Sequence, residues 1–343
     1  MAITGGAGFI GSNLILYLIS KYPEYEFVNI DCLTYAGNLS NLSSIEDNQN
    51  YHFEKVDIAN KDNLGSLFEK YQFDGLIHLA AETHVDRSII SPEQFINTNI
   101  IGTFNLLELS QILRDKNSSF RFYHISTDEV YGSIETDFAT ELSAYNPSSP
   151  YAAAKASSDH LVRAYNKTYG LDVVISNCTN NYGPLQFPEK LIPLVINNII
   201  HKKEIPIYGN GKQERDWLFV TDHCRAIDML FHKGKSGEIY NIASGNLTTN
   251  LKLVESLCEI IDNKGISKNS KSLIKFIKDR PGHDFRYALD SSKIANELNW
   301  SVQTNLNDGL KNCVGWYISN QSWLENCISG DYLNYYEKVY SKR

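Results

Sequence analysis

The stretch that most constrains the fold is TGGAGFIGS, residues 4–12. It follows a short apolar segment, MAIT, and precedes SNLILYLISKY, in which the apolar residues recur with helical spacing. Glycine at such a turn lets the backbone bend tightly and lets another group approach it closely. A strand, a glycine-rich turn and a helix in this order predict a dinucleotide-binding βα unit, with a plain tight turn as the alternative.

An acidic residue strengthens this interpretation. Asp31 ends the second predicted strand, EFVNID, 20 residues after Gly11. A carboxylate in this place accepts hydrogen bonds from a ribose diol and repels a 2′-phosphate. The glycines Gly5, Gly8 and Gly11 would let a pyrophosphate reach the free N–H groups of the following helix. The sequence therefore predicts NAD rather than NADP as the cofactor.

Strand-like and helix-like segments alternate along the first half of the chain. Further strands are expected at 51–58, 73–81, 120–127 and 172–177, and helices at 63–71, 92–114 and 151–169. This alternation predicts an α/β fold, a doubly wound parallel sheet of the Rossmann type.

The regular alternation of strand-like and helix-like segments ends at about residue 177, and this change predicts two domains. We expect an NAD-binding domain over 1–177, to which the chain returns at about 216–244. A smaller C-terminal α/β domain over 178–343 would mainly bind the substrate. The stretch 262–278, rich in Lys, Asn and Ser, predicts a solvated connection.

Composition excludes several classes of partner. The net charge of −8 argues against nucleic acid or an anionic membrane surface. No apolar run reaches the length of a membrane helix, so we expect a cytoplasmic protein. The six cysteines show no CxxC spacing, which predicts buried reduced thiols and no metal site.

The segment YAAAK places Tyr151 and Lys155 on one face of a predicted helix. A nearby ammonium favours the phenolate form of a tyrosine, which could then act as a base. Taken alone, such a pair is more often a surface pair. Because this pair follows a dinucleotide-binding loop and a strand that ends in Thr127, Tyr151 is predicted to be an acid/base. Thr127 could hydrogen-bond the substrate hydroxyl on which Tyr151 acts.

Two adjacent carboxylates, Asp128 and Glu129, follow that strand in STDEVYG. They lie at the carboxyl edge of the predicted sheet, where open α/β folds bind ligands. An acidic turn in water is the alternative. Their position beside Thr127 favours a role in the reaction.

Arginines in RDW (Arg215) and RPGH (Arg280) have the planar donor groups that bind phosphate. Two that converge would clamp a diphosphate, whereas a single arginine is usually a solvated charge. His84 follows a predicted strand at the sheet edge, and a substrate contact and a structural role both remain open.

Longer motifs identify a family. TGGAGFIGS, HLAAETHVDRSI, HISTDEVYG, YNPSSPYAAAKASSDHLVRAY and RPGHDFRYALD together resemble the extended short-chain dehydrogenases/reductases, and within them the dTDP-glucose 4,6-dehydratases. The resemblance spans residues 4 to about 290. It implies a lyase that oxidises C4 of dTDP-glucose, eliminates water across C5–C6 and returns the hydride to C6. It also implies NAD, a homodimer formed through the helices near 92–114 and 151–169, and deoxysugar supply for polysaccharide.

Other functions remain as alternatives. In a sugar-nucleotide 4-epimerase or decarboxylase, Asp128 and Glu129 would be spectators. Other nucleotide-hexose 4,6-dehydratases differ in the base. A catalytically silent NAD-binding protein is disfavoured by the intact Tyr151, Lys155 and Thr127.

The resemblance assigns residues as well. Tyr151, Asp128 as acid and Glu129 as base match catalytic positions, and Thr127 and Lys155 join them. The expected cofactor residues are Gly5, Gly8, Phe9, Ile10, Gly11, Asp31, Cys32, Leu33, Thr34, Asp57, Ile58, Leu79, Ala80, Ala81, Glu82, Thr83, Thr98, Tyr151, Lys155 and Asn181. The expected substrate residues are Thr83, His84, Thr127, Asn180, Glu189, Lys190, Leu191, Pro206, Ile207, Tyr208, Arg215, Asn250, Asp279, Arg280, Pro281, Gly282 and His283. One departure from the family is Glu214, whose carboxylate would weaken diphosphate binding at Arg215 unless it points away.

Overall fold

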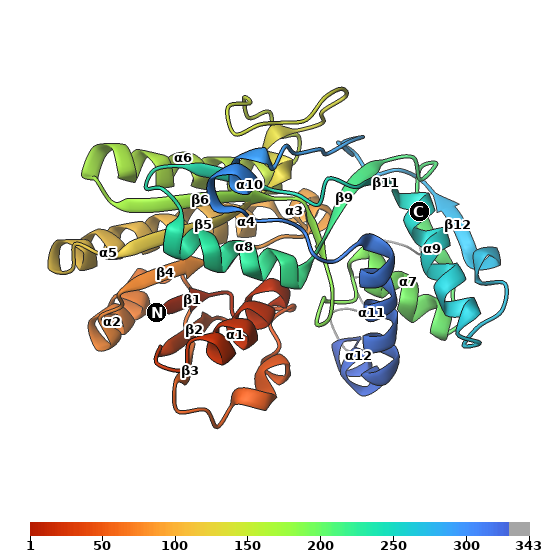
Figure 1. Ribbon diagram of the computed structural model, residues 1–343, viewed down its shortest axis with the longest axis horizontal. Helices are drawn as coiled ribbons and strands as arrows, with labels where there is room; N and C mark the ends of the chain where they lie inside the picture. Colours follow the sequence, from red (N-terminus) through yellow and green to blue (C-terminus); the bar gives the residue numbers. More distant parts are fainter. Residues whose placement is uncertain (329–343) are drawn as a thin grey trace.

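Seven parallel strands form the central sheet of the protein (Figure 1), whose computed structural model describes residues 1–328. Their order across the sheet is β10-β6-β5-β4-β1-β2-β3, and every neighbouring pair is parallel. The strands are β1 (Ala2–Thr4), β2 (Phe27–Asp31), β3 (Tyr51–Lys55), β4 (Gly75–His78), β5 (Arg121–Thr127), β6 (Asp172–Cys178) and β10 (Ile239–Ile242). The parallel sheet expected from the alternating pattern is confirmed.

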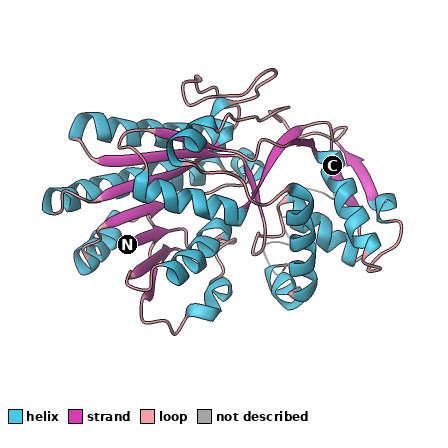
Figure 2. Ribbon diagram, in the orientation of Figure 1, coloured by secondary structure: helices cyan, strands magenta, loops and turns pink. Residues whose placement is uncertain are grey.

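Helices cover both faces of this sheet (Figure 2). One face carries α1 (Phe9–Lys21), α8 (Val220–Lys233) and α10 (Ser292–Leu298), and the other carries α2 (Lys61–Tyr71), α5 (Thr103–Lys116) and α6 (Pro150–Tyr169). Successive residues of β1 point to opposite faces, so Ile3 packs in the core with α1 and α8, and Ala2 in the core with α2 and α5. The Rossmann-type, doubly wound fold class is thereby confirmed.

The segment between β4 and β5 departs from a regular helix. Here α3 (Val85–Ile90) and α4 (Pro92–Phe95) lead into a π-helical turn, η2 (Ile96–Gly102), which continues directly into α5. The expected helical stretch over 92–114 is present, but its first half has a wider turn than an α-helix. Such insertions are frequent at functional sites.

The C-terminal part adds two small sheets. One contains β7 (Asn180–Tyr182), β9 (Glu214–Phe219) and β11 (Leu247–Thr249), and the other pairs β8 (Ile205–Tyr208) with β12 (Ile274–Ile277). Helices α7 (Leu191–Ile200), α9 (Asn250–Asn263), α11 (Leu306–Ser319) and α12 (Gln321–Cys327) pack a separate apolar core around them. The described residues also form the 3-10 helices η1 (Leu39–Ile45), η3 (Asp128–Tyr131) and η4 (Ser270–Leu273).

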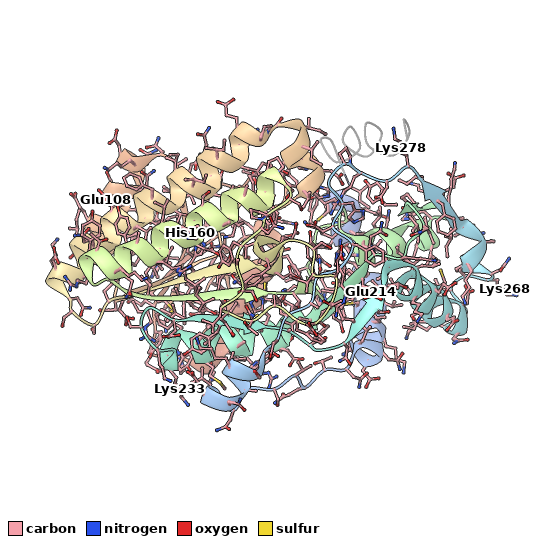
Figure 3. All side chains as sticks on the ribbon, turned by 90° about the horizontal axis from the view of Figure 1, so that it is seen from above. Glu108, His160, Glu214, Lys233, Lys268 and Lys278 are labelled. Carbon is pink, nitrogen blue, oxygen red and sulfur yellow. The ribbon has the colours of Figure 1, made fainter. Side chains whose placement is uncertain are left out.

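The expectation of a solvated connection over 262–278 is wrong. This stretch contains the end of α9, η4 and β12, and β12 pairs in parallel with β8. The Ser270 hydroxyl donates to the Asp262 carboxylate over 2.6 Å, which ties the turn to α9. Part of the stretch does face solvent: Lys268 is exposed and lies at the periphery of the molecule (Figure 3).

The elements α8 and β10 lie with the central sheet, although they follow the first C-terminal strands in sequence. The predicted division into an NAD-binding and a sugar-nucleotide-binding domain remains a prediction. Part of the second predicted domain, residues 329–343, lies outside the described residues.

Candidate active site

The glycine loop after β1 is packed so closely that side chains would not fit. Gly5 has φ +72°, and a Cβ built on it would lie 2.7 Å from the Ala80 nitrogen. A Cβ on Gly11 would collide with the Gly5 carbonyl oxygen. The loop thus presents bare backbone at the start of α1, which is the feature that a pyrophosphate requires.

Asp31 is held in place beside this loop, at the end of β2. Its Oδ2 accepts a hydrogen bond from the Ala7 N–H at 3.0 Å, and its Oδ1 accepts one from the Leu33 N–H at 2.8 Å. Burial raises the pKa of Asp31, and these two backbone donors oppose that rise. A positioned acid beside a bare glycine loop fits the ribose and pyrophosphate of NAD.

A first cavity runs from the glycine loop past the carboxyl ends of β1, β2, β4, β5 and β6. Every residue expected to contact the cofactor lines it except Leu33. Thr127, Asp128 and Glu129 line it as well. Several of the residues that line this cavity were not assigned from the sequence: Ile30, Gly37, Val56, Ile125, Ser126, Cys178, Thr179, Gln186 and Phe187. Some of them end a strand or directly follow one, and that position could have identified them.

A second cavity adjoins the first. Of the expected substrate residues, it is lined by Thr83, His84, Asn180, Glu189, Lys190, Leu191, Pro206, Ile207, Tyr208, Arg215, Asn250, Arg280 and His283. Asp279, Pro281 and Gly282 do not line it, and Thr127 lines the first cavity. The sequence analysis missed Val85, Asp86, Leu194, Trp217 and Tyr287. The two cavities meet at the residues they share: Thr83, Glu129, Asn180 and Lys190.

The two adjacent carboxyl groups are held at this junction by Thr127. Its hydroxyl accepts a hydrogen bond from the Glu129 N–H at 3.3 Å and donates one to Asp128 Oδ1 at 3.2 Å. Burial, and then the charge of Glu129, raises the pKa of Asp128 well above its usual value.

Glu129 experiences different surroundings. Burial raises the pKa of Glu129 too, but the charges of Arg280, Arg215 and Lys190 oppose that rise. Asp128 therefore favours its protonated form, while three cations favour the carboxylate of Glu129. Neighbouring carboxyl groups with such a contrast can serve as an acid and a base.

Tyr151 and Lys155 both line the first cavity, but the pKa of Tyr151 is not lowered in this structure. Burial, and then the charge of Glu129, raises the pKa of Tyr151 well above its usual value, while a hydrogen bond with Thr127 opposes the rise. The Lys155 ammonium instead donates to the Ile125 carbonyl oxygen at 2.8 Å. Burial lowers the pKa of Lys155 to about 8.

Arg215 and Arg280 converge on the second cavity, as a diphosphate clamp requires. Burial, and to a smaller degree the charge of Arg280, lowers the pKa of Arg215. The Arg215 guanidinium lies 4.2 Å from the centre of the Tyr287 ring. Its two terminal nitrogens also donate to the backbone carbonyl oxygens of residues 214, 284 and 285, which fixes its orientation.

Glu214 does not compete for this clamp. Its carboxylate pairs with Arg286, with Oε2 3.3 Å from Nε, and Glu214 lines neither cavity. The one departure from the family pattern beside Arg215 is therefore accommodated by a local ion pair.

His84 is buried, as a structural role requires, and it also lines the second cavity, where it could contact a substrate. Burial, followed by the charges of Lys190, Arg87 and Arg280, lowers the pKa of His84 well below its usual value. The imidazole is accordingly neutral and faces the cavity among cations.

The π-helical turn supports the wall of the first cavity. The Asn99 side chain accepts a hydrogen bond from the Glu82 N–H at 2.9 Å and donates one to the Glu82 carbonyl oxygen at 3.0 Å. Thr98, its neighbour, lines the cavity directly. The turn thus positions the segment that follows β4.

Over residues 1–328, the structure contains no group of three His, Cys, Asp or Glu side chains arranged for a metal ion. None of the described helices is both long and apolar enough to cross a bilayer. Cys32 is half-buried, the other five cysteines are buried, and all six are free thiols.

Comparison with known proteins places the chain in a family. The family model for GDP-mannose 4,6 dehydratase matches residues 2–313. The dTDP-glucose 4,6-dehydratase of Salmonella typhimurium is 49% identical, with 99% of each chain covered. This chain belongs to the dTDP-glucose 4,6-dehydratase family. The family member of Neisseria meningitidis is 48% identical, with 96% of each chain covered. The family expected from the motifs is confirmed.

Solved structures agree. A dTDP-glucose 4,6-dehydratase of Streptomyces venezuelae, crystallised with NAD bound, has a TM-score of 0.88 and 43% identity, covering 95% of this chain and 99% of that one. The family member of Bacillus anthracis, also in complex with NAD, has a TM-score of 0.85 and 42% identity, covering 95% and 98%. A UDP-glucose 4-epimerase of Thermotoga maritima has a TM-score of 0.84 at 30% identity, covering 93% and 99%.

Proposed function

We propose that the protein is an NAD-dependent dTDP-glucose 4,6-dehydratase that forms dTDP-4-keto-6-deoxyglucose. The observation that carries this proposal is the adjacent pair Asp128, which lines the first cavity, and Glu129, which lines both, in contrasting surroundings. A 4-epimerase needs no acid and base of this kind, because it eliminates no water. The relatives of Salmonella typhimurium, Neisseria meningitidis, Streptomyces venezuelae and Bacillus anthracis carry the name dTDP-glucose 4,6-dehydratase.

Each residue of the site has a task in this reaction. NAD, when bound in the first cavity, accepts a hydride from C4, returns it to C6 and brings a positive charge that favours the phenolate of Tyr151. Tyr151 takes the proton of the C4 hydroxyl, to which Thr127 is hydrogen bonded. Glu129 takes the C5 proton while Asp128 protonates the C6 hydroxyl, so that the C5–H and C6–O bonds break and water leaves. Glu129 then returns its proton to C5 when C6 receives the hydride. Lys155 supports Tyr151 from the same face of α6.

The second cavity would hold the sugar nucleotide. Arg215 and Arg280 supply planar donors for the diphosphate, and Lys190 stands where the sugar would meet the cofactor. Under this proposal the domain at 1–177, joined by 216–244, binds NAD, and the domain at 178–343 mainly binds the nucleotide.

A panel of nucleotide sugars tests the proposal. Purified protein is incubated with dTDP-glucose, UDP-glucose, GDP-mannose and UDP-glucuronate, and the ultraviolet absorbance of a 4-keto product is read in alkali. We expect product from dTDP-glucose above all others. A dTDP-galactose product without the 4-keto absorbance would identify an epimerase, and loss of carbon dioxide from UDP-glucuronate would identify a decarboxylase.

We also propose that two copies of the chain pair through the helices near 92–114 and 151–169. Five isoleucines of α3, η2 and α5 are 38–55% exposed: Ile89, Ile90, Ile96, Ile101 and Ile112. Exposed apolar side chains of this kind support burial against a second copy of the chain. Light scattering should give a dimer for the native chain and a monomer for Ile101→Asp, whereas Ile266→Asp, on another surface, should remain dimeric. A cytoplasmic location and a role in polysaccharide precursor supply belong to the same proposal.

A further inference from the structure

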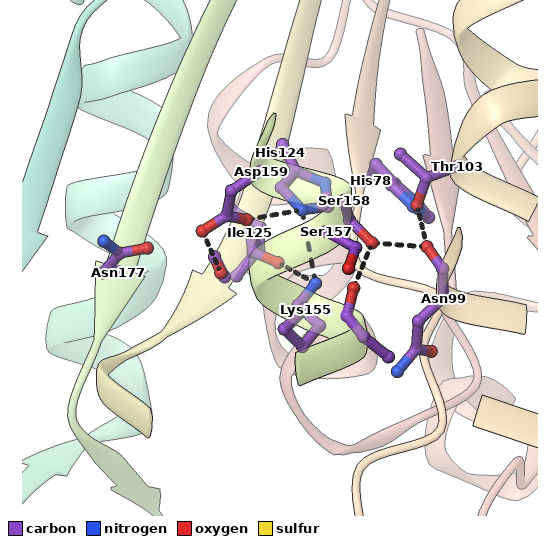
Figure 4. Close-up of polar contacts among 12 residues, drawn as sticks. His78, Asn99, Thr103, His124, Ile125, Lys155, Ser157, Ser158, Asp159 and Asn177 are labelled. Atoms are coloured by element: carbon purple, nitrogen blue, oxygen red, sulfur yellow. Dashed lines mark hydrogen bonds and ion pairs between the residues drawn. The ribbon is translucent and has the colours of Figure 1, made fainter. Parts of the chain in front are cut away.

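A buried polar network lies behind Lys155 (Figure 4). Lys155 Nζ lies 3.4 Å from His124 Nε2, and the same ring nitrogen lies 3.2 Å from Asp159 Oδ1. The exposed fractions of Lys155, His124 and Asp159 are 4%, 0% and 0%. The imidazole of β5 therefore stands between an ammonium and a carboxyl group one turn apart on α6.

The hydrogen bonds of this network indicate its charges. Asp159 Oδ2 accepts hydrogen bonds from the hydroxyls of Ser126 and Tyr145, each at 2.9 Å. Two donors on one oxygen favour the ionised carboxylate. The pKa of Asp159 is raised to about 6. Burial causes the rise, and the charge of Lys155 and these two donors limit it. Asp159 is accordingly ionised at neutral pH.

His124 is neutral, because burial and then the charge of Lys155 lower its pKa well below its usual value. Its Nδ1 has no hydrogen-bond partner among the described residues. The Lys155 ammonium can donate to Nε2 only where that nitrogen carries no proton, and Asp159 Oδ1 has no hydrogen-bond partner among the described residues, so Asp159 acts on Lys155 by its charge.

Lys155 needs a counter-charge in this setting. Burial lowers the pKa of Lys155 to about 8, and the charge of Asp159 is the main opposing influence. The other titratable groups that face Lys155 from neighbouring elements are uncharged at neutral pH: Tyr151 on α6, Cys178 on β6, His78 on β4 and His124 on β5.

We propose that Asp159 is a positioning residue that keeps Lys155 protonated, acting across the neutral ring of His124. Asp159 lines neither cavity, so its influence on the reaction passes through Lys155. The inference rests on the proposed function, in which Lys155 acts beside Tyr151.

The first test compares pH profiles. In Asp159→Asn, which preserves the shape of the side chain, the alkaline limb of kcat/KM for dTDP-glucose should move to lower pH by roughly one unit, because an opposite charge nearby is lost. The matched control is Asp222→Asn on α8, whose buried carboxylate pairs with Arg225 and not with Lys155. Its limb should stay in place. An unshifted limb in Asp159→Asn would overturn the inference and leave the proposed function standing.

The second test needs no activity and therefore holds even if the wild type does not turn over dTDP-glucose. The pKa of Lys155 is about 8 in the folded protein, below the unfolded value of about 10.4, so its charge destabilises the fold and stability rises between these pH values. Without its counter-charge the ammonium costs more. Asp159→Asn should therefore lower the Tm of the ligand-free protein more at pH 7 than at pH 9.

An equal loss of Tm at both pH values, as in Asp222→Asn, would show that Asp159 is merely structural. Should Asp159→Asn fail to fold, Tyr145→Phe removes one donor from the carboxylate and should move the alkaline limb in the same direction by a smaller amount. A limb that Tyr145→Phe leaves unmoved would then overturn the inference.

Discussion

Replacing Glu129 by glutamine should block the elimination of water while leaving the oxidation at C4 intact. The amide has nearly the same volume as the carboxylate, so the side chain still fits between the two cavities. It cannot take the C5 proton. Tyr151 and Thr127, which are proposed to act at C4, are unchanged.

The structure sets the size of the effect. Loss of a general base costs about 10²–10⁴-fold in rate, which corresponds to about 3–5 kcal/mol of transition-state stabilisation. The charge of Glu129 also raises the pKa of Asp128. Glu129→Gln therefore also lowers the protonated fraction of the proposed acid, and the loss should lie at the upper end of this range. The same charge raises the pKa of Tyr151, so its removal should not slow the oxidation.

Two measurements separate these steps. Exchange of the C5 hydrogen with deuterated water, followed by mass spectrometry, should disappear in Glu129→Gln, while the absorbance of reduced cofactor on the enzyme should accumulate after dTDP-glucose is added. The matched control is Glu214→Gln, which alters a carboxylate outside both cavities and should stay within a few-fold of the wild type. If both steps slow equally in Glu129→Gln, or neither does, the assignment of the base is refuted.

Three further outcomes are expected. Tyr151→Phe should lose about 10²–10⁴-fold in turnover while retaining NAD, measured by extraction of denatured protein, and near-native turnover would exclude Tyr151 as the base. The wild type should purify with NAD and not NADP, and Asp31→Ala should retain less of it. NADP in the extract would contradict the proposed role of that carboxylate. Leu107→Ala in the core should lower stability by about 2–5 kcal/mol, whereas Leu142→Ala, at a 96% exposed position, should change it by under about 0.5 kcal/mol in denaturant titrations.

The fold was predictable where the information is local. Each strand of the central sheet is a short apolar run, and the loop after residue 4 marks the βα unit without reference to distant residues. The strand β12 was missed because its four residues pair with β8, about 70 positions earlier, and its flanking lysines and serines suggest solvent. Such long-range pairing leaves no periodic signal in the sequence itself.

The residues that form the site could be predicted from the sequence, but the shifts in their pKa values could not. Nearly every expected cofactor residue lines the first cavity, because strand ends of a parallel sheet meet at one edge. The convergence of Arg215 and Arg280 could be seen only in three dimensions. The raised pKa of Tyr151 was not predicted, since helical spacing does not reveal how deeply both groups are buried.

The π-helical turn at Ile96–Gly102 makes the length of this segment as important as its composition. A π turn holds one residue more than an α turn within a single turn of the helix. Deleting one residue from it would let the turn relax into an ordinary α-helix while the flanking helices kept their orientation, and the wider turn itself would be lost. Asn99 would then no longer reach Glu82 from its present position while α5 kept its packing. In this segment of the chain, substitutions are thus better tolerated than single-residue deletions.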